Sequence, residues 1–263
     1  MTEQAILTHI DDFGRATLTM NRPEIHNAFD DVLIAAMTQE LKRLEGDDRV
    51  RIVFLAAAGT SFSAGADLNW MRRMADYSRE QNLTDALGLA ELMKTLNFLK
   101  KPTVSLVQGA AYGGGVGLVA CCDVALATRR ASFCLSEVKL GLIPAVISPY
   151  VVEAIGSRAS RRYFQSAELF GAAEAHRLGL VHEVVAEDEL AGAAERLGEA
   201  LLKNGPSAMA AAKELVVRVS SGPIDETMIR DTAERIAGAR ASAEGREGLG
   251  AFLEKRKPLW VKG

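Results

Sequence analysis

Two short stretches of small residues, SFSAGADLNW (61–70) and AAYGGGVG (110–117), each follow an apolar run and precede a helical pattern. Glycine and alanine let backbone N–H groups approach a ligand without obstruction from side chains. The first N–H groups of a helix have no intrahelical partner and carry the positive end of its dipole. One N–H from each turn, aimed at the same oxygen, would form an oxyanion hole. Close packing of a helix against a strand is the structural alternative for either turn taken alone.

The motifs that bind phosphate or activate a serine are missing from both stretches. A P-loop ends in Gly-Lys-Ser/Thr, and neither stretch has that ending. The dinucleotide pattern G-x-G-x-x-G, counted from Gly113, fails at Leu118. Ser61 and Ser63 lack the flanking glycines of a hydrolase nucleophile elbow. The pair of turns therefore favours an anionic transition state over a bound phosphate.

Glu137 is the carboxylate that could act as an acid and a base. It lies in FCLSEVKLGLIPA (133–145), a segment that is otherwise apolar and nearly neutral. A carboxyl in such surroundings has a raised pKa and can exchange protons with a substrate near neutral pH. The structural alternative is a surface glutamate paired with an arginine or a lysine.

Metal and thiol chemistry find little support in the sequence. The histidines show no metal-ligand spacing, so we predict no metal site; they are His9, His26, His176 and His182. The cysteines form no disulfide framework and are expected to be reduced and buried; they are Cys121, Cys122 and Cys134. A catalytic cysteine is the alternative, but no histidine lies near any of them in the sequence.

Composition and charge are those of an ordinary globular protein and give no sign of a nucleic-acid or membrane partner. Of the 263 residues, 48% are apolar and 25% are charged, and the net charge is −3. This charge argues against a nucleic-acid partner, although SRASRR (157–162) is a modest basic cluster. The 21 uncharged residues between Lys101 and Asp123 could span a bilayer by length, but five glycines divide them into strand, turn and helix. No membrane association is expected, and the lack of an export signal predicts a cytoplasmic location.

Strands alternate with helices in the first half of the sequence. Alternating apolar residues at 5–10 and 15–20 predict a β-hairpin around a turn at 11–14. Buried strands are predicted before the two small-residue turns, at 51–58 and 103–109, and a further strand at 123–128. Helices are predicted at 29–46, from Asn69, at 80–99 and directly after the triple glycine.

From Pro144 onward helical patterns dominate, interrupted by one strand at 179–185. Four further helices are predicted, at 187–203, 206–219, 224–239 and 241–255. This order of elements predicts an α/β core, residues 1–190, followed by a carboxyl-terminal helical region, residues 191–263.

Six motifs, in order along most of the chain, resemble the crotonase (enoyl-CoA hydratase/isomerase) superfamily: NRPEIHNAF, SFSAGADLNWM, KPTVSLVQGAAYGGGVGLVACCDVALA, FCLSEVKLGLIPA, GLVHEVV and AFLEKRKP. The resemblance implies a crotonase-like spiral of ββα turns and a helical carboxyl-terminal trimerisation region, in a homotrimer or a dimer of trimers. It also implies an acyl-CoA thioester substrate whose enolate is stabilised by two backbone N–H groups. Coenzyme A then arrives as part of the substrate, and no separate cofactor is expected.

The resemblance assigns the two oxyanion donors to the N–H groups of Ala66 and Gly114. It assigns contacts with coenzyme A to residues around both turns and to one near the chain end: His26, Ala64, Gly65, Asp67, Leu68, Gly113 and Lys255. Asp67 has a second interpretation, as the N-cap of the helix that follows it. Lys255 would reach the site across a subunit interface.

The sequence departs from the family pattern at one catalytic position. Hydratases of the family commonly carry a glutamate just after the triple glycine and a second one at the position of Glu137, but the first position here is Gly117. One carboxylate can still hydrate a double bond as a single acid–base group. It equally suits a Δ3,Δ2-enoyl-CoA isomerase, which moves a proton from C2 to C4.

SAGADLNWMRRMA and LSEVKLGLIPAVISPYVV closely resemble the bacterial 3-methylglutaconyl-CoA hydratases of leucine degradation. Such a substrate carries a free carboxylate, for which Arg72, Arg73 and Lys139 offer cations; a solvated helix face is the alternative for the two arginines. We therefore predict an enoyl-CoA hydratase-type lyase that uses Glu137. The alternatives are the isomerase, a general short-chain enoyl-CoA hydratase, and a crotonase-fold protein that binds RNA or has lost catalysis.

Overall fold

The amino-terminal strands form a hairpin, as their alternation predicts. In the computed structural model, which describes residues 4–220 and 222–261, β1 (Ile6–Ile10) pairs antiparallel with β2 (Arg15–Met20). Gly14 closes the turn with a φ of 93°, where a Cβ would lie 2.4 Å from the carbonyl oxygen of Arg49. Only glycine fits this turn without displacing the chain beside it.

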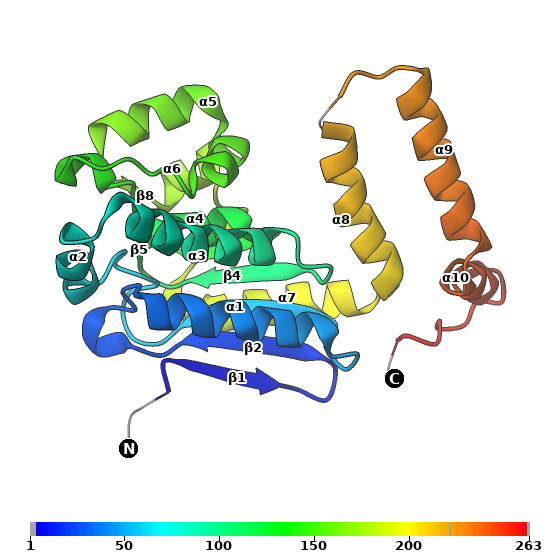
Figure 1. Cartoon of the computed structure of the whole chain (residues 1–263). Coiled ribbons are helices and arrows are strands. Elements are labelled where there is room, and N and C mark those ends of the chain that lie inside the picture. The colour runs from blue at the N-terminus through cyan, green and yellow to red at the C-terminus, as the bar shows by residue number, and fades with distance from the viewer. Residues whose placement is uncertain (1–3, 221, 262–263) are drawn as a thin grey trace.

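The hairpin is one edge of a six-stranded sheet in the order β1-β2-β3-β4-β6-β9 (Figure 1). Beyond β2 every pairing in this sheet is parallel. The added strands are β3 (Ile52–Ala57), β4 (Thr103–Val107), β6 (Val124–Thr128) and β9 (Glu183–Val185). All four fall inside the segments that the sequence predicts as strands.

Helices cover both faces of this sheet, because its strands are apolar on both sides. Val53 and Leu55 share a buried cluster with α1 (Asp31–Gly46) and α3 (Arg79–Asn97). Ile52 and Phe54 point to the opposite face, where α7 (Leu190–Leu202) packs on them. Alternate residues of one strand therefore serve two layers, as expected for a parallel sheet.

A second, three-stranded sheet was not predicted from the sequence. It consists of β5 (Ala110–Tyr112), β7 (Ser132–Cys134) and β8 (Phe170–Gly171). β5 leads directly into α4 (Gly114–Cys121), and α5 (Ser148–Ser166) and α6 (Ala172–Leu178) follow later in the chain. Strands of two or three residues carry too little periodicity to stand out in a sequence.

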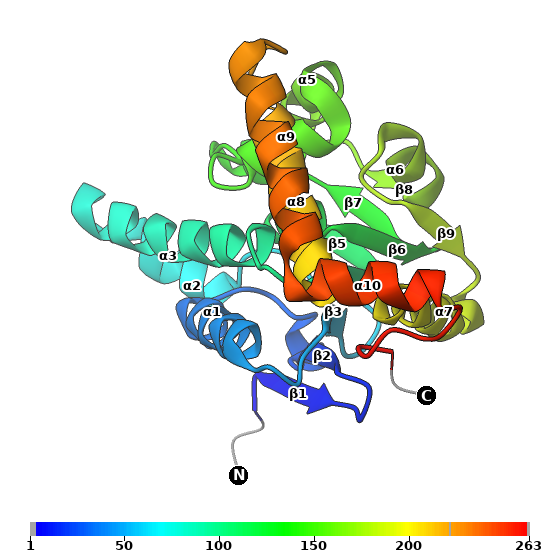
Figure 2. The same ribbon diagram turned by 90° about the vertical axis from the view of Figure 1, so that its right-hand side faces the viewer.

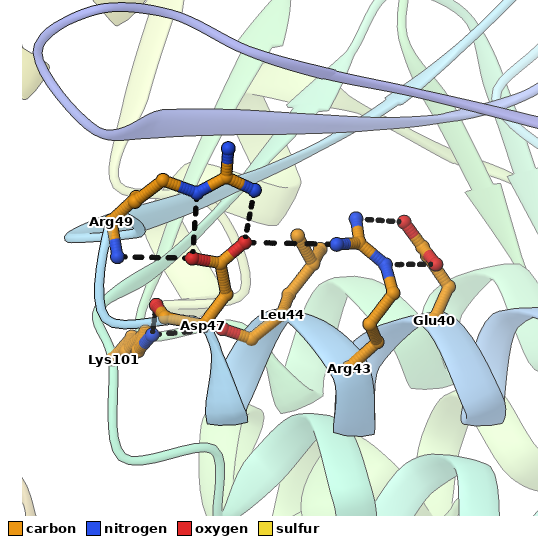
Figure 3. A network of polar contacts seen from close by, with 6 residues as sticks. All are labelled: Glu40, Arg43, Leu44, Asp47, Arg49 and Lys101. Atoms are coloured by element: carbon orange, nitrogen blue, oxygen red, sulfur yellow. Dashed lines mark hydrogen bonds and ion pairs between the residues drawn. The ribbon is translucent and has the colours of Figure 1, made fainter.

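Polar contacts fix the end of α1 against the start of β4 (Figure 3). The Lys101 ammonium donates hydrogen bonds to the carbonyl oxygens of Leu44, at 2.8 Å, and Asp47, at 2.5 Å. Arg49 binds the Asp47 carboxylate at 2.7 Å, and this lowers the pKa of that carboxyl. A cation at the carboxyl end of a helix adds hydrogen bonds to the last carbonyls and complements the negative end of the helix dipole.

The last three helices extend to one side of the two sheets (Figures 1 and 2). They are α8 (Pro206–Ser220), α9 (Glu226–Ala241) and α10 (Ala243–Leu253). Lys213 of α8 reaches the core through an ion pair with Asp123, at 2.9 Å. Large apolar side chains are exposed on all three helices and just beyond them: Val216, Val217, Val219, Ile224, Ile229, Ile236, Leu249, Phe252, Leu253 and Leu259.

The boundary predicted after residue 190 falls at the start of α7, which packs on the sheet together with the core. The division of the chain at that residue stays a prediction. All three cysteines are free and buried, as expected, and burial raises the pKa of Cys122 to about 12. Among the described residues, no helix is both long and apolar enough to cross a membrane.

Candidate active site

The structure brings the two small-residue turns side by side. Ser63 and Ala111 form a parallel bridge, with the Ser63 N–H on the carbonyl of Ala110 and the Tyr112 N–H on that of Ser63, both at 2.9 Å. A Cβ on Gly113 would lie only 3.9 Å from the Cα of Gly65. Both glycines have positive φ, 91° at Gly65 and 51° at Gly113, so the close approach depends on a backbone that glycine adopts readily.

The N–H of Ala66 points away from the strand-like segment that holds its turn. Phe29 bridges Ala66, and its N–H donates to the carbonyl of Gly65 while its carbonyl accepts from Asp67, both at 2.7 Å. In a parallel bridge these bonds come from the two neighbours of the bridged residue, whose own N–H faces the other side. Across residues 4–220 and 222–261, the Ala66 N–H has no acceptor, and the residue is exposed.

Gly114 supplies a second unpartnered N–H, at the first position of α4. Its N-cap, Gly113, has φ 51° and ψ −118° and offers no side chain to accept that hydrogen bond. The ring of Phe29 lies 3.1 Å from where a Cβ of Gly114 would be, which keeps this position small. Each of the two neighbouring turns thus presents an unpartnered N–H at the predicted donor position in the described part of the chain, as an oxyanion hole needs.

Glu137 lies against the same turn. It begins a short 3-10 helix (Glu137–Leu140), which Gly141 ends with a φ of 71°. Its Oε1 is 3.2 Å from the Cβ position of Gly113, and its Oε2 is buried without a hydrogen-bond partner in the described chain. Burial raises the pKa of Glu137, and its own backbone N–H opposes this only in part.

No arginine or lysine of the described residues pairs with Glu137, so the alternative of a surface ion pair does not hold. A carboxyl that is largely dehydrated and has an unused oxygen is suited to accept and return a proton. Beside two unpartnered N–H groups, it can remove or add a proton at the carbon next to a carbonyl that those groups bind.

Buried polar side chains that sequence reasoning missed hold the first turn in place. Asn27 is fully buried with φ 53°, and its amide donates to the carbonyls of Ala58, at 2.8 Å, and Ser61, at 2.9 Å. The Ser63 hydroxyl donates to the Asn27 carbonyl at 2.9 Å, and Gln108 also donates to the Ser61 carbonyl, at 3.0 Å. The available signal was the asparagine itself, two residues before Phe29, because asparagine tolerates positive φ.

The residues assigned to coenzyme A lie in and beside the first turn, with one exception. Ala64, Ala66 and Leu68 are exposed, alternate residues of one segment, while Gly65 between them is buried. Asp67 caps α2 (Leu68–Ala75), because its carboxylate accepts from the N–H groups of Asn69, at 2.8 Å, and Trp70, at 3.0 Å. This confirms the capping interpretation of Asp67 and leaves a contact with coenzyme A as a prediction.

His26 lies at the edge of the same turn. It is exposed, its Nδ1 is 3.1 Å from the Ser61 hydroxyl oxygen, and its carbonyl accepts from the Ala64 N–H at 2.9 Å. Lys255 follows α10, and α10 lies on the opposite side of the molecule from α2 (Figure 1). One chain therefore brings His26 to the turn but does not bring Lys255 there.

The three cations proposed for an acyl carboxylate differ in their surroundings. Arg73 pairs with Asp31, and Arg72 donates to the Asn69 side chain at 2.7 Å. Lys139 is exposed on the short helix of Glu137, and no carboxylate of the described chain pairs with it. Both arginines thus have polar partners at the surface, which fits the alternative of a solvated helix face, while the Lys139 side chain has no polar partner in the described chain.

Comparison with known proteins shows one consistent relationship. Residues 14–263 match the family model described as enoyl-CoA hydratase/isomerase. The crystal structure of an enoyl-CoA hydratase from Shewanella pealeana is 49% identical with a TM-score of 0.95, over 98% of this chain and 97% of that one. A 1,2-epoxyphenylacetyl-CoA isomerase from Escherichia coli is 33% identical over 97% of this chain and 98% of its own length. The 2,3-dehydroadipyl-CoA hydratase of the same organism is 30% identical over 92% of each chain.

Proposed function

Because this chain belongs to the enoyl-CoA hydratase/isomerase family and has the crotonase fold, we propose that it adds water across the 2,3-double bond of 3-methylglutaconyl-CoA, in leucine degradation. An enzyme of the enoyl-CoA hydratase type is the coarser conclusion, which the relatives support directly. The observation that carries the proposal is the dehydrated Glu137 carboxyl against Gly113, beside the unpartnered N–H groups of Ala66 and Gly114.

In the proposed reaction the thioester oxygen accepts hydrogen bonds from the N–H groups of Ala66 and Gly114. Glu137, as a carboxylate, takes a proton from water while the hydroxyl oxygen bonds to C3, and negative charge moves to the thioester oxygen. The carboxyl then returns a proton to C2, so one molecule of water is added in total. Fixed donors stabilise the enolate at little reorganisation cost, and one such donor is typically worth about 2.7–4 kcal/mol.

Coenzyme A would lie along the exposed edge of the first turn, as part of the substrate rather than as a separate cofactor. Ala64 and Leu68 are exposed there, Gly65 and Gly113 keep the backbone bare, and His26 stands at its end. Lys255 would contact coenzyme A only from a second copy. The exposed apolar side chains of α8, α9 and α10 support a homotrimer or a dimer of trimers, and the expected location is the cytoplasm.

A substrate with a carboxylate on the acyl group is supported by Lys139, which has no acidic partner in the described chain. The E. coli relative is named for 2,3-dehydroadipyl-CoA, an acyl group that also ends in a carboxylate. The resemblance of the segments around Ala66 and Glu137 to 3-methylglutaconyl-CoA hydratases supports the branched acyl chain.

A second candidate, a Δ3,Δ2-enoyl-CoA isomerase, is favoured by the single carboxylate. Gly117 leaves Glu137 as the acid–base group of the turn, and one base suffices to move a proton from C2 to C4. Mass analysis separates the two reactions, because hydration adds one water and isomerisation leaves the mass unchanged.

The test is incubation of the purified protein with 3-methylglutaconyl-CoA and, separately, with crotonyl-CoA. We expect the mass of one water to be added to 3-methylglutaconyl-CoA, with crotonyl-CoA turned over far more slowly. Equal rates would support a general short-chain hydratase. No hydration of either thioester, together with conversion of a 3-enoyl-CoA, would contradict the proposal in favour of the isomerase.

A further inference from the structure

The space beside Gly117, just after the triple glycine, is filled by side chains from distant parts of the chain. A Cβ on Gly117 would lie 2.3 Å from the Cγ2 of Ile147 and 2.9 Å from its Cβ. The Cε of Met93 would be 3.2 Å away on another side. Distances below 3 Å to a branched Cβ cannot be relieved by turning a flexible side-chain end, so any larger residue at Gly117 must displace Ile147.

Ile147 and the Glu137 carboxyl pack on the same end of α4, Ile147 on Gly117 in its first turn and Glu137 on its N-cap Gly113. The Gly117 N–H donates to the Gly113 carbonyl at 3.3 Å, so these two glycines are one helical turn apart. At Gly113 the space above the missing side chain holds Oε1 of Glu137, and at Gly117 it holds Ile147.

We propose that Ile147 is a specificity-determining residue, which forms an apolar wall of the acyl site next to Glu137 and recognises an apolar branch on C3 of the acyl group. The proposal rests on the proposed function for the location of the site. Ile147 is 2% exposed and carries no polar atom that could hold a second water molecule. The neighbouring Oε2 of Glu137 is buried without a partner, as expected beside hydrocarbon.

A purely structural role for Ile147 makes a different prediction. Ile147 precedes the first turn of α5, so packing of α5 on α4 could be its whole function. In that case truncation would lower the stability of the fold and slow every substrate alike. A wall that touches the acyl branch must instead change the preference between substrates that differ by that branch.

The experiment measures exchange of the C2 proton with D2O in isovaleryl-CoA and butyryl-CoA, which differ by one methyl group on C3. Glu137 would take the C2 proton and return a deuteron, leaving the thioester otherwise unchanged, so the readout does not depend on hydration or isomerisation. We compare the wild type with Ile147→Val and Ile147→Ala. Ile155→Val and Ile155→Ala are matched controls, since Ile155 is a buried isoleucine on α5.

We expect Ile147→Ala to lower the isovaleryl-to-butyryl ratio of kcat/KM about 10-fold, with a smaller decrease in Ile147→Val, because one methyl group in an apolar site is typically worth about 10-fold or more. The Ile155 variants should leave the ratio unchanged. An unchanged ratio in both Ile147 variants, or an equal change in the Ile155 variants, would overturn the proposal. Exchange without hydration by the wild type would contradict the proposed reaction only, whereas no exchange of either thioester would overturn the site and the role of Ile147 together.

Discussion

Replacement of Glu137 by glutamine isolates the proton chemistry from the shape of the site. The two side chains have nearly the same volume, and the structure shows no ion pair that the change would break. Positioned general acid–base catalysis contributes about 100- to 10,000-fold, or about 3–5 kcal/mol of barrier. We expect kcat for hydration to fall by about this factor, with little change in KM, because the N–H groups of Ala66 and Gly114 are untouched.

The pH dependence gives the same carboxyl a second test. Glu137 must be deprotonated to take a proton from water, and burial raises its pKa above the ordinary value of 4.5. We expect kcat/KM of the wild type to fall as the pH is lowered through that raised pKa. The residual activity of Glu137→Gln should lack this acid limb.

As the pH rises, the free energy of unfolding of the wild type should fall while its activity rises. A carboxyl whose pKa is raised by folding binds its proton more tightly in the folded protein, so the wild type loses stability as the pH rises from 4.5 through the folded pKa. Glu137→Gln should therefore be at least as stable as the wild type near neutral pH in urea unfolding, and its advantage should vanish below pH 4.5. Glu153→Gln, the same change at an exposed residue, is the control. Near wild-type hydration by Glu137→Gln, with its fold intact, would refute the assignment of the base.

Three further substitutions test the parts around this carboxyl. Gly114→Pro removes one donor N–H and should lower kcat about 100- to 1,000-fold, whereas Gly114→Ala also adds a Cβ beside the Phe29 ring but keeps the N–H; equal losses in steady-state kinetics would argue against the donor. Asp67→Ala removes the cap of α2 and should lower the free energy of unfolding in urea by about 1 kcal/mol. Asp67→Asn should lower it much less, because asparagine is also a good N-cap. Lys101→Met removes two hydrogen bonds that a charged donor makes at the end of α1 and should cost about 1.5–3 kcal/mol, while the exposed Lys100→Met should cost little.

The sequence predicts the large sheet because its strands carry their own signals. Val53 and Leu55 alternate with Ile52 and Phe54, all four apolar, which is typical of a strand buried on both faces. The three strands of the small sheet lack this signal, and their backbone is set by pairing with one another. The capping role of Asp67 could be predicted, because it depends on four neighbouring residues only. A contact of Asp67 with a ligand could not be predicted in this way.

The geometry of the site depends on contacts between distant segments. Each small-residue turn is visible in the sequence, but their approach depends on the bridge between Ser63 and Ala111 and on the buried amide of Asn27. The raised pKa of Glu137 could be predicted, because its own segment is apolar. The contact of its carboxyl with Gly113 could not, since 23 intervening residues, 114–136, form a helix and two strands between them.

The structure shows what takes the place of the family's first glutamate, at the position of Gly117. A glutamate that had merely been lost would leave a space beside α4, and a single substitution would restore the second carboxylate. Here Ile147 fills that space, so Gly117 and Ile147 pack against each other. A second carboxylate at residue 117 would therefore require Ile147 to move. Gly117→Glu should therefore lower the free energy of unfolding by about 1–3 kcal/mol or more without faster hydration. Gly88→Glu, at a helical glycine with open space around it, should cost nothing in the same urea titration. Only shortening Ile147 as well should recover the stability, and a stable, faster Gly117→Glu single variant would show that the two positions are independent.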